Sequence, residues 1–145
     1  MKKSLVVLYA MTSFVGADNL VIKESSQDFA TTVSQLQKTI QESDMKILGL
    51  IDHREIAHKG TMDINDEQVI LFANPNYNSR MILNDPNVAL ELPLKIAVRK
   101  DFKGKVWIIY RNPADLKENY KLSHCGVLPE LEKTIGEITD TVAKK

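Results

Sequence analysis

The sequence predicts an α+β domain in which helices pack on one or both faces of a single sheet. Three observations lead to this fold class: short apolar runs of strand length, two amphipathic stripes with helical spacing, and a turn signal that joins two neighbouring strands. Strands that follow one another between separated helices favour α+β over a regular β-α-β alternation. The predicted order of elements is β-α-β-β-α-β-β-α-α.

The first helix is predicted by the spacing of its apolar residues. Four residues at steps of four, three and four form one stripe: Phe29, Val33, Leu36 and Ile40. Ser25 and Asp28 precede this stripe with the spacing of a capping box. We therefore expect a helix over residues 26–43 with Ser25 as its N-cap, after a short strand at residues 20–22.

Apolar runs predict the middle strands of the sheet. Residues 46–53 and 68–73 are apolar nearly throughout, and the turn signal Asn74-Pro75 ends the second run. A single helical turn is expected at residues 55–60 and a short helix at residues 77–83.

The second half of the chain begins with a predicted hairpin. Strands at residues 92–99 and 105–111 are joined by residues 101–104, and a link of this length with glycine near its end is typical of antiparallel strands. Pro113 suits the first turn of a helix that is expected to reach Leu122. A final helix is expected after Pro129, with an apolar seam at Leu128, Leu131, Ile135, Ile138 and Val142.

The composition is that of an ordinary globular protein. The chain has 145 residues, with 19 basic and 19 acidic side chains, so its formal net charge is zero. This length supports one domain with a core of its own, and the charge balance excludes a generally basic nucleic-acid binder. The single cysteine, Cys125, excludes an intramolecular disulfide framework and is expected to be a buried small residue or an unpaired thiol.

The N-terminus has the layout of a secretory signal. Lys2 and Lys3 precede an apolar run at residues 5–15, and small residues follow up to Ala17. We expect residues 1–17 to be a cleaved signal, residues 18–145 to form the mature domain, and the protein to be periplasmic or secreted. The alternative is that the run is a buried first strand. No second run reaches the length of a membrane span, so none is expected in the mature chain.

Four short motifs, in order, resemble those of one family over residues 20–142. They are Ile51-Asp52-His53 with Ala57 and Gly60, Phe72-Ala73-Asn74-Pro75, Ala89-Leu90-Glu91-Leu92-Pro93-Leu94-Lys95, and Gly104-Lys105-Val106-Trp107 leading to Tyr110-Arg111-Asn112-Pro113. In this arrangement the sequence resembles the family catalogued as domain of unknown function number 302. The resemblance implies a compact α+β domain that forms dimers in some members, and it carries no activity that can be transferred.

The candidate site residues are few. His53 follows Asp52 at the end of a predicted strand, where an imidazole could ligate a metal or haem iron or transfer protons; the alternative is that His53 caps the strand. His58 could join His53 as a metal ligand, although the spacing matches no closed zinc motif and favours a solvated turn. Lys95 could hold an anion or act as a nucleophile, or it could be a sheet-edge lysine that discourages aggregation. Asn74 and Asn112 are turn residues that could also frame the same pocket.

Two functions follow from these candidates. The first is a binding module that holds a small ligand, metal or haem near His53, with Asn74, Lys95 and Asn112 as further contacts. The alternative is a small enzyme with Asp52-His53 as an acid–base pair and Lys95 as anion holder or nucleophile. The identity of any cofactor stays open at this point.

The family resemblance also favours a homodimer. We expect it to pack through the centre of the final helix's seam, at Leu131, Ile135 and Ile138. The alternative is that the seam packs on the sheet of its own chain.

Overall fold

The computed structural model describes residues 20–143, so the predicted secretory signal at residues 1–17 lies outside the described residues. The strands of this part of the chain are β1 (Leu20–Glu24), β2 (Lys46–Asp52), β3 (Glu67–Ala73), β4 (Leu94–Lys100) and β5 (Val106–Arg111). The α-helices are α1 (Phe29–Glu42), α2 (His53–Lys59), α3 (Pro75–Asn84) and α4 (Val127–Asp140), and the 3₁₀ helices are η1 (Pro86–Glu91) and η2 (Pro113–Glu118).

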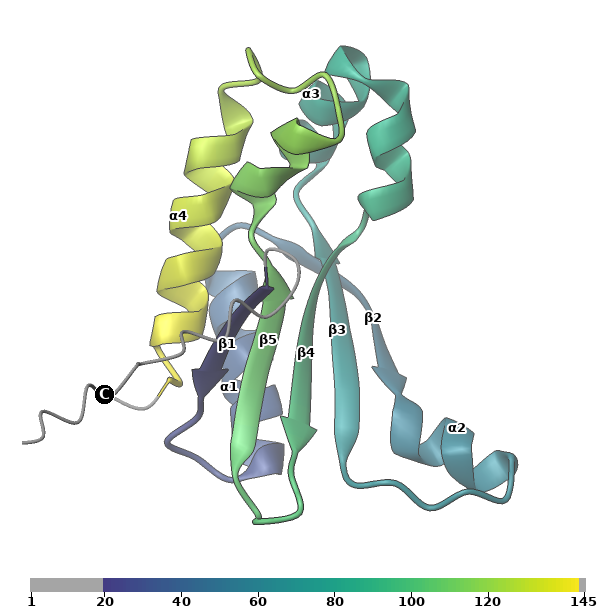
Figure 1. Cartoon of the computed structure of the whole chain (residues 1–145). Helices are drawn as coiled ribbons and strands as arrows, with labels where there is room; N and C mark the ends of the chain where they lie inside the picture. Colours follow the sequence, from purple (N-terminus) through teal and green to yellow (C-terminus); the bar gives the residue numbers. More distant parts are fainter. Residues whose placement is uncertain (1–19, 144–145) are drawn as a thin grey trace, which may run out of the picture.

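The five strands form one antiparallel sheet in the order β1-β5-β4-β3-β2 (Figure 1). The predicted α+β class with helices on a single sheet is therefore confirmed. β4 is the central strand, so the alternative interpretation of Lys95 as a sheet-edge lysine is wrong. Pro93 directly precedes β4, where its missing N–H interrupts no ladder hydrogen bond.

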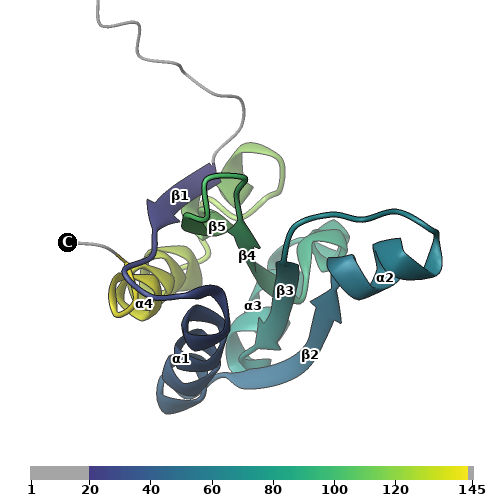
Figure 2. The same cartoon turned by 90° about the horizontal axis from the view of Figure 1, so that it is seen from below.

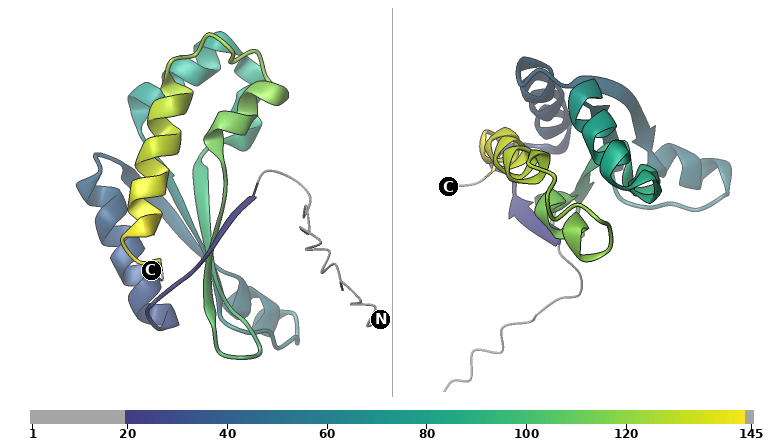
Figure 3. Two further views of the ribbon diagram at one scale, coloured as in Figure 1. Left: turned by 60° about the vertical axis from the view of Figure 1, so that its left-hand side comes forward. Right: turned by 90° about the horizontal axis from the view of Figure 1, so that it is seen from above.

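Helices α1 and α4 lie side by side against one face of the sheet (Figures 2 and 3). The strand residues on this covered face are buried: Ile70, Phe72, Leu94, Ile96, Val98, Val106 and Ile108. Leu36 and Ile40 of α1 and Leu131 of α4 belong to the same core, which also includes Cys125 as a buried free thiol. Each such side chain contributes roughly 1.5–3 kcal/mol when it leaves water.

None of the described helices covers the opposite face of the sheet, which we call the open face (Figure 1). Because successive side chains of a strand point to alternate faces, every second residue of each strand lies on the open face. Paired residues of neighbouring strands therefore form rows that run across the sheet. Its middle row is apolar in all five strands: Ile22, Ile109, Ala97, Val69 and Ile51.

The first helix begins three residues later than the sequence predicts. Asp28, not Ser25, is the N-cap of α1, and its Oδ1 accepts a hydrogen bond from the backbone N of Thr31 at 2.8 Å. Ser25 instead pairs with Ala143 near the end of the chain and shares a hydrogen bond of 2.7 Å with the hydroxyl of Thr32. The capping-box interpretation is wrong because the carboxylate takes the role of the cap.

The seam of α4 packs on the sheet of its own chain. Ile135 is 2 % exposed and Ile138 is 1 % exposed, and both belong to the core. The seam is therefore not available to a second subunit, and the alternative interpretation of this helix is correct. A homodimer stays a prediction, but the seam of α4 cannot be its contact surface.

Replacing Ile135 with Glu tests the position of the seam. We expect this substitution to destabilise the fold by about 3–5 kcal/mol, because it buries a charge that has no partner. Urea unfolding followed by circular dichroism measures the loss. A folded, monomeric Ile135→Glu protein in size-exclusion chromatography would contradict the burial of this residue in its own core.

Candidate functional site

The predicted Asp52-His53 pair lies where β2 passes into α2. Asp52 is the N-cap of α2, and its carboxylate accepts hydrogen bonds from the backbone N of Glu55 at 2.9 Å and from Nε2 of Gln68 at 2.8 Å. The hydrogen bond from the Glu55 backbone, followed by that from Gln68, lowers the pKa of Asp52. His53 begins the helix as an exposed side chain. The carboxylate is thus directed to the helix start and to β3 rather than to the imidazole.

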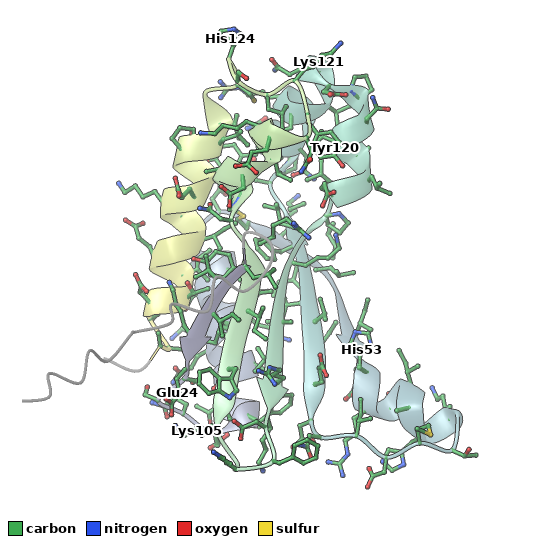
Figure 4. All side chains as sticks on the ribbon, in the orientation of Figure 1. Glu24, His53, Lys105, Tyr120, Lys121 and His124 are labelled. Atoms are coloured by element: carbon green, nitrogen blue, oxygen red, sulfur yellow. The ribbon has the colours of Figure 1, made fainter. Side chains whose placement is uncertain are left out.

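The histidines do not converge. Nε2 of His58 lies 3.4 Å from Oδ1 of Asp63 on the exposed surface around α2. His53 lies at the α2 end of the molecule, and His124 lies at the opposite end (Figure 4). Among residues 20–143, no three His, Cys, Asp or Glu side chains are grouped so that they could hold a metal ion. A metal or haem site at His53 or His58 stays a prediction.

Lys95 lies apart from the Asp52-His53 pair. Lys95 is opposite Leu71 near the end of β3, whereas Asp52 is opposite Gln68 near its start. Leu71 and Gln68 are three residues apart in β3, which is about 10 Å at roughly 3.3 Å per residue. Because successive side chains of a strand point to alternate faces, Lys95 and Asp52 lie on opposite faces of the sheet. The structure therefore does not assemble these three residues into one acid–base site.

Asn74 and Asn112 both cap helical elements. Oδ1 of the buried Asn74 accepts a hydrogen bond from the backbone N of Asn76 at 2.9 Å, and its Nδ2 donates to the carbonyl O of Asp44 at 3.0 Å. Asn112 caps η2, and its Nδ2 donates to Oε1 of Glu132 at 2.8 Å. Their amides serve local structure, as turn residues do.

A cavity of about 250 Å³ opens on the open face where β4 begins and β5 ends; we call it the open-face cavity. The pairing of these two strands stops at Ile96 and Tyr110, beyond which the chain continues into η1 and η2. The mouth of the cavity is lined by Leu20, Val69, Ala97 and Ile109. Its floor consists of buried core residues: Leu94, Tyr110, Pro113, Leu116 and Ile135. Its wall is thus mainly apolar.

Three charged residues complete the wall: Lys95, Arg111 and Glu91. Nζ of Lys95 donates a hydrogen bond to the carbonyl O of Glu91 at 3.2 Å. The hydroxyl of Tyr120 donates to Oε1 of Glu91 at 2.9 Å and so joins η1 to the segment that follows η2. This hydrogen bond, together with burial and the charge of Glu91, raises the pKa of Tyr120.

Asp85 supports this end of the cavity. The buried carboxylate caps η1 by accepting from the backbone N of Asn87 at 3.0 Å, and it also accepts from the backbone N of Lys121 at 2.9 Å. Tyr120 and Lys121 lie together at the end of the molecule away from α2 (Figure 4). The backbone hydrogen bond from Lys121, followed by that from Asn87, lowers the pKa of Asp85. Asp85 thereby holds together the two segments that carry Glu91 and Tyr120.

Sequence reasoning found one of the charged cavity residues and missed the others. Lys95 was a candidate because it interrupts an apolar strand, whereas Arg111 and Glu91 carried no comparable signal. Arg111 could have been found only from the register of the hairpin, since its position relative to Lys95 follows from which residues of β4 and β5 pair.

The fold defines a small α+β domain built on one antiparallel sheet. The family described as "Domain of unknown function DUF302" matches residues 21–142, and the chain belongs to this family. The crystal structure of an uncharacterized conserved protein of this family from Bacillus stearothermophilus has a TM-score of 0.75 with this chain at 18% identity, and the match covers 87% of this chain and 99% of that one. The family resemblance seen in the four motifs is confirmed.

Longer proteins also match part of the chain. A protein named fluoride-specific ion channel FluC 1 from Brucella suis biovar 1 (strain 1330) is 25% identical over 103 residues, which are 71% of this chain and 41% of that protein. The protein of the same name from Brucella abortus biovar 1 (strain 9-941) matches equally over 38% of its length. The chain therefore spans about two fifths of these curated relatives. In the described part of this chain, no helix is long and apolar enough to cross a membrane.

Replacing Asp85 with Asn tests its support of the cavity end. Because folding lowers the pKa of Asp85, its charge stabilises the fold above the ordinary pKa of about 3.9, and this contribution is lost as the pH falls through the lowered value. We expect Asp85→Asn to be less stable than the wild type at pH 7 and closer to it at pH 3, as measured by urea midpoints.

The exposed Asp63 provides the control substitution, Asp63→Asn. An Asp85→Asn protein whose stability changes with pH in parallel with the wild type would show that the Asp85 charge does not hold these segments.

Proposed function

We propose that this chain is a small-ligand-binding module whose site is the open-face cavity. The observation that carries the proposal is a cavity of about 250 Å³ that reaches from the open face to core residues and has three charged groups in its wall. Apolar concavities with a few converging polar groups are the usual form of small-molecule sites, although their volumes commonly begin near 300 Å³. A compact ligand is therefore the best fit.

The site is proposed at the cavity rather than at His53 for a physical reason. His53 is exposed, and it does not line this cavity. An exposed imidazole binds a metal or haem tightly only with further ligands and a water-poor surrounding. The open-face cavity offers buried apolar surface and fixed charges together, so it can bind an organic molecule without a metal.

The names of the Brucella relatives suggest fluoride as a comparison ligand. Those proteins are named as fluoride-specific ion channels, and this chain spans 41% of the first of them. A cavity of about 250 Å³ with an apolar floor is much larger than a single halide ion. We therefore propose an organic ligand for this chain and expect fluoride not to bind in the cavity.

A cavity-filling substitution tests the proposal. Ala97 lies in the middle of the open face and lines the cavity, so Ala97→Phe should fill it with the added ring. With 1-octanol as the probe, amide shifts in an NMR titration of the wild type should concentrate around Lys95 and Ile109. We expect Ala97→Phe to bind 1-octanol at least tenfold more weakly.

Two matched substitutions serve as controls. Ile51→Phe adds a ring in the same row of the open face but outside the cavity, and His53→Ala removes the imidazole. Both should bind 1-octanol within about twofold of the wild type. The proposal fails if Ala97→Phe binds as tightly as the wild type, or if the shifts gather around His53.

We also propose that the chain is exported. The support is the pattern of Lys2, Lys3, the apolar run at residues 5–15 and Ala17, which has the three parts of a secretory signal.

Expression of the full chain with a C-terminal tag in a Gram-negative host tests export. We expect the protein in the periplasmic fraction, with a mass that corresponds to a chain beginning at Asp18. Recovery of an uncleaved chain in the cytoplasmic fraction would overturn the proposal, whereas the proposed ligand site would be unaffected.

A further inference from the structure

Two cationic side chains stand at the point where β4 and β5 separate. Ile96 and Tyr110 form the last pair between these strands, and Lys95 and Arg111 are the next residues outward. Both cations belong to the open face and line the open-face cavity. Like charges at neighbouring cross-strand positions destabilise a sheet, so a negative group between them would stabilise this arrangement.

The protein neutralises these two cations only in part. Among residues 20–143, no ion pair joins Lys95 or Arg111 to a carboxylate. Glu91 lines the same cavity, but Lys95 contacts its carbonyl oxygen, and its carboxylate accepts the hydrogen bond of Tyr120. The cavity wall thus carries two positive charges and one negative charge.

Outside the cavity, basic side chains on the open face lie next to acidic ones. Nζ of Lys105 is 3.5 Å from Oε2 of Glu24 at the hairpin end of the sheet (Figure 4). Arg99, on the same strand and face as Lys95, lies opposite Glu67 of β3. By contrast, Lys95 lies opposite the apolar Leu71. The excess of positive charge is therefore confined to the cavity end of the open face.

The apolar floor limits which anions fit. A small inorganic anion between the cations would leave the apolar floor, to which Leu94 and Leu116 contribute, uncovered on the cavity side. A neutral apolar ligand would cover the floor and leave both cations without a partner. A molecule with one anionic head and one short apolar tail satisfies both parts of the wall.

We propose that the open-face cavity binds an amphipathic anion with a carboxylate or phosphate head between Lys95 and Arg111 and a single short aliphatic tail on the apolar floor. The inference rests on the proposed function of this cavity as a ligand site. The guanidinium can bind either head group through two parallel hydrogen bonds, and the lysine adds a compact positive charge. The cavity volume of about 250 Å³ is too small to enclose both tails of a lipid with two long chains.

Probes that share the same tail distinguish the contribution of the head group to the affinity from that of the tail. Octanoate, octyl phosphate and neutral 1-octanol are titrated by calorimetry into the full mature chain at low salt, with acetate as the head group alone. We expect at least one of the two anionic octyl probes to bind at least tenfold more tightly than 1-octanol. Acetate should bind at least tenfold more weakly than octanoate, because each buried methylene raises affinity about fourfold.

Substitutions that keep an apolar stem test the two cations. Lys95→Met and Arg111→Met should each lower the affinity for the better anionic octyl probe about tenfold and leave that for 1-octanol within about twofold. Arg99→Met removes a cation from the same strand and face outside the cavity, and it should leave both affinities unchanged. Circular dichroism establishes that each variant is folded.

The possible outcomes separate this inference from the proposed function. Preference for octanoate or for octyl phosphate supports the inference and identifies the head group. Three outcomes would overturn the inference. The first is that 1-octanol and both anions bind equally tightly, and the second is that Lys95→Met and Arg111→Met bind the preferred anion as the wild type does. The third is that acetate binds as tightly as octanoate. In those cases the cavity still stands as a ligand site if Ala97→Phe weakens 1-octanol binding. If no probe binds, 1-octanol included, the proposed function fails as well.

Discussion

The pairing of Ile96 with Tyr110 decides which side chains of the central hairpin enter the core. A shift of one residue would move every side chain of β5 to the other face relative to β4, which would expose the core and remove a cation from the cavity wall. Asp101 holds this register, because its carboxylate accepts hydrogen bonds from the backbone N of Lys105 at 3.0 Å and from Nε1 of Trp107 at 2.8 Å. The turn at one end of the hairpin thus supports the register that forms the cavity at the other end.

Much of the fold could be predicted because its signals are local. The apolar stripes of α1 and α4 repeat with the period of a helix, and the strands of the hairpin alternate between buried and exposed residues. Prolines at positions 75 and 113 begin α3 and η2, where their fixed backbone angle suits a first turn. The four motifs between Ile51 and Pro113 indicated the family that the match over residues 21–142 shows.

The candidate site could be predicted only in part because it depends on register and strand order. The sequence predicts a link at residues 101–104, whereas β4 and β5 are joined by residues 101–105, with Lys100 opposite Val106. The observed register brings Arg111 next to Lys95. The turn that belongs to it is closed by the backbone N of Asp101, which donates to the carbonyl O of Lys105 at 2.8 Å, and by the hydrogen bonds to the Asp101 carboxylate. The central position of Lys95 likewise follows from long-range strand order, which local patterns do not contain.

The pairing of β1 with β5 has a consequence for how the chain folds. β1 begins the described chain, yet its partner is the last strand, and Ser25 Oγ donates a hydrogen bond to the carbonyl O of Val142, 117 residues away in sequence. Contacts between such distant segments carry a large loop-closure entropy and slow the approach to the native state. The edge strand β1 can therefore complete its contacts with β5 and with the end of α4 only after the residues up to Val142 have been synthesised.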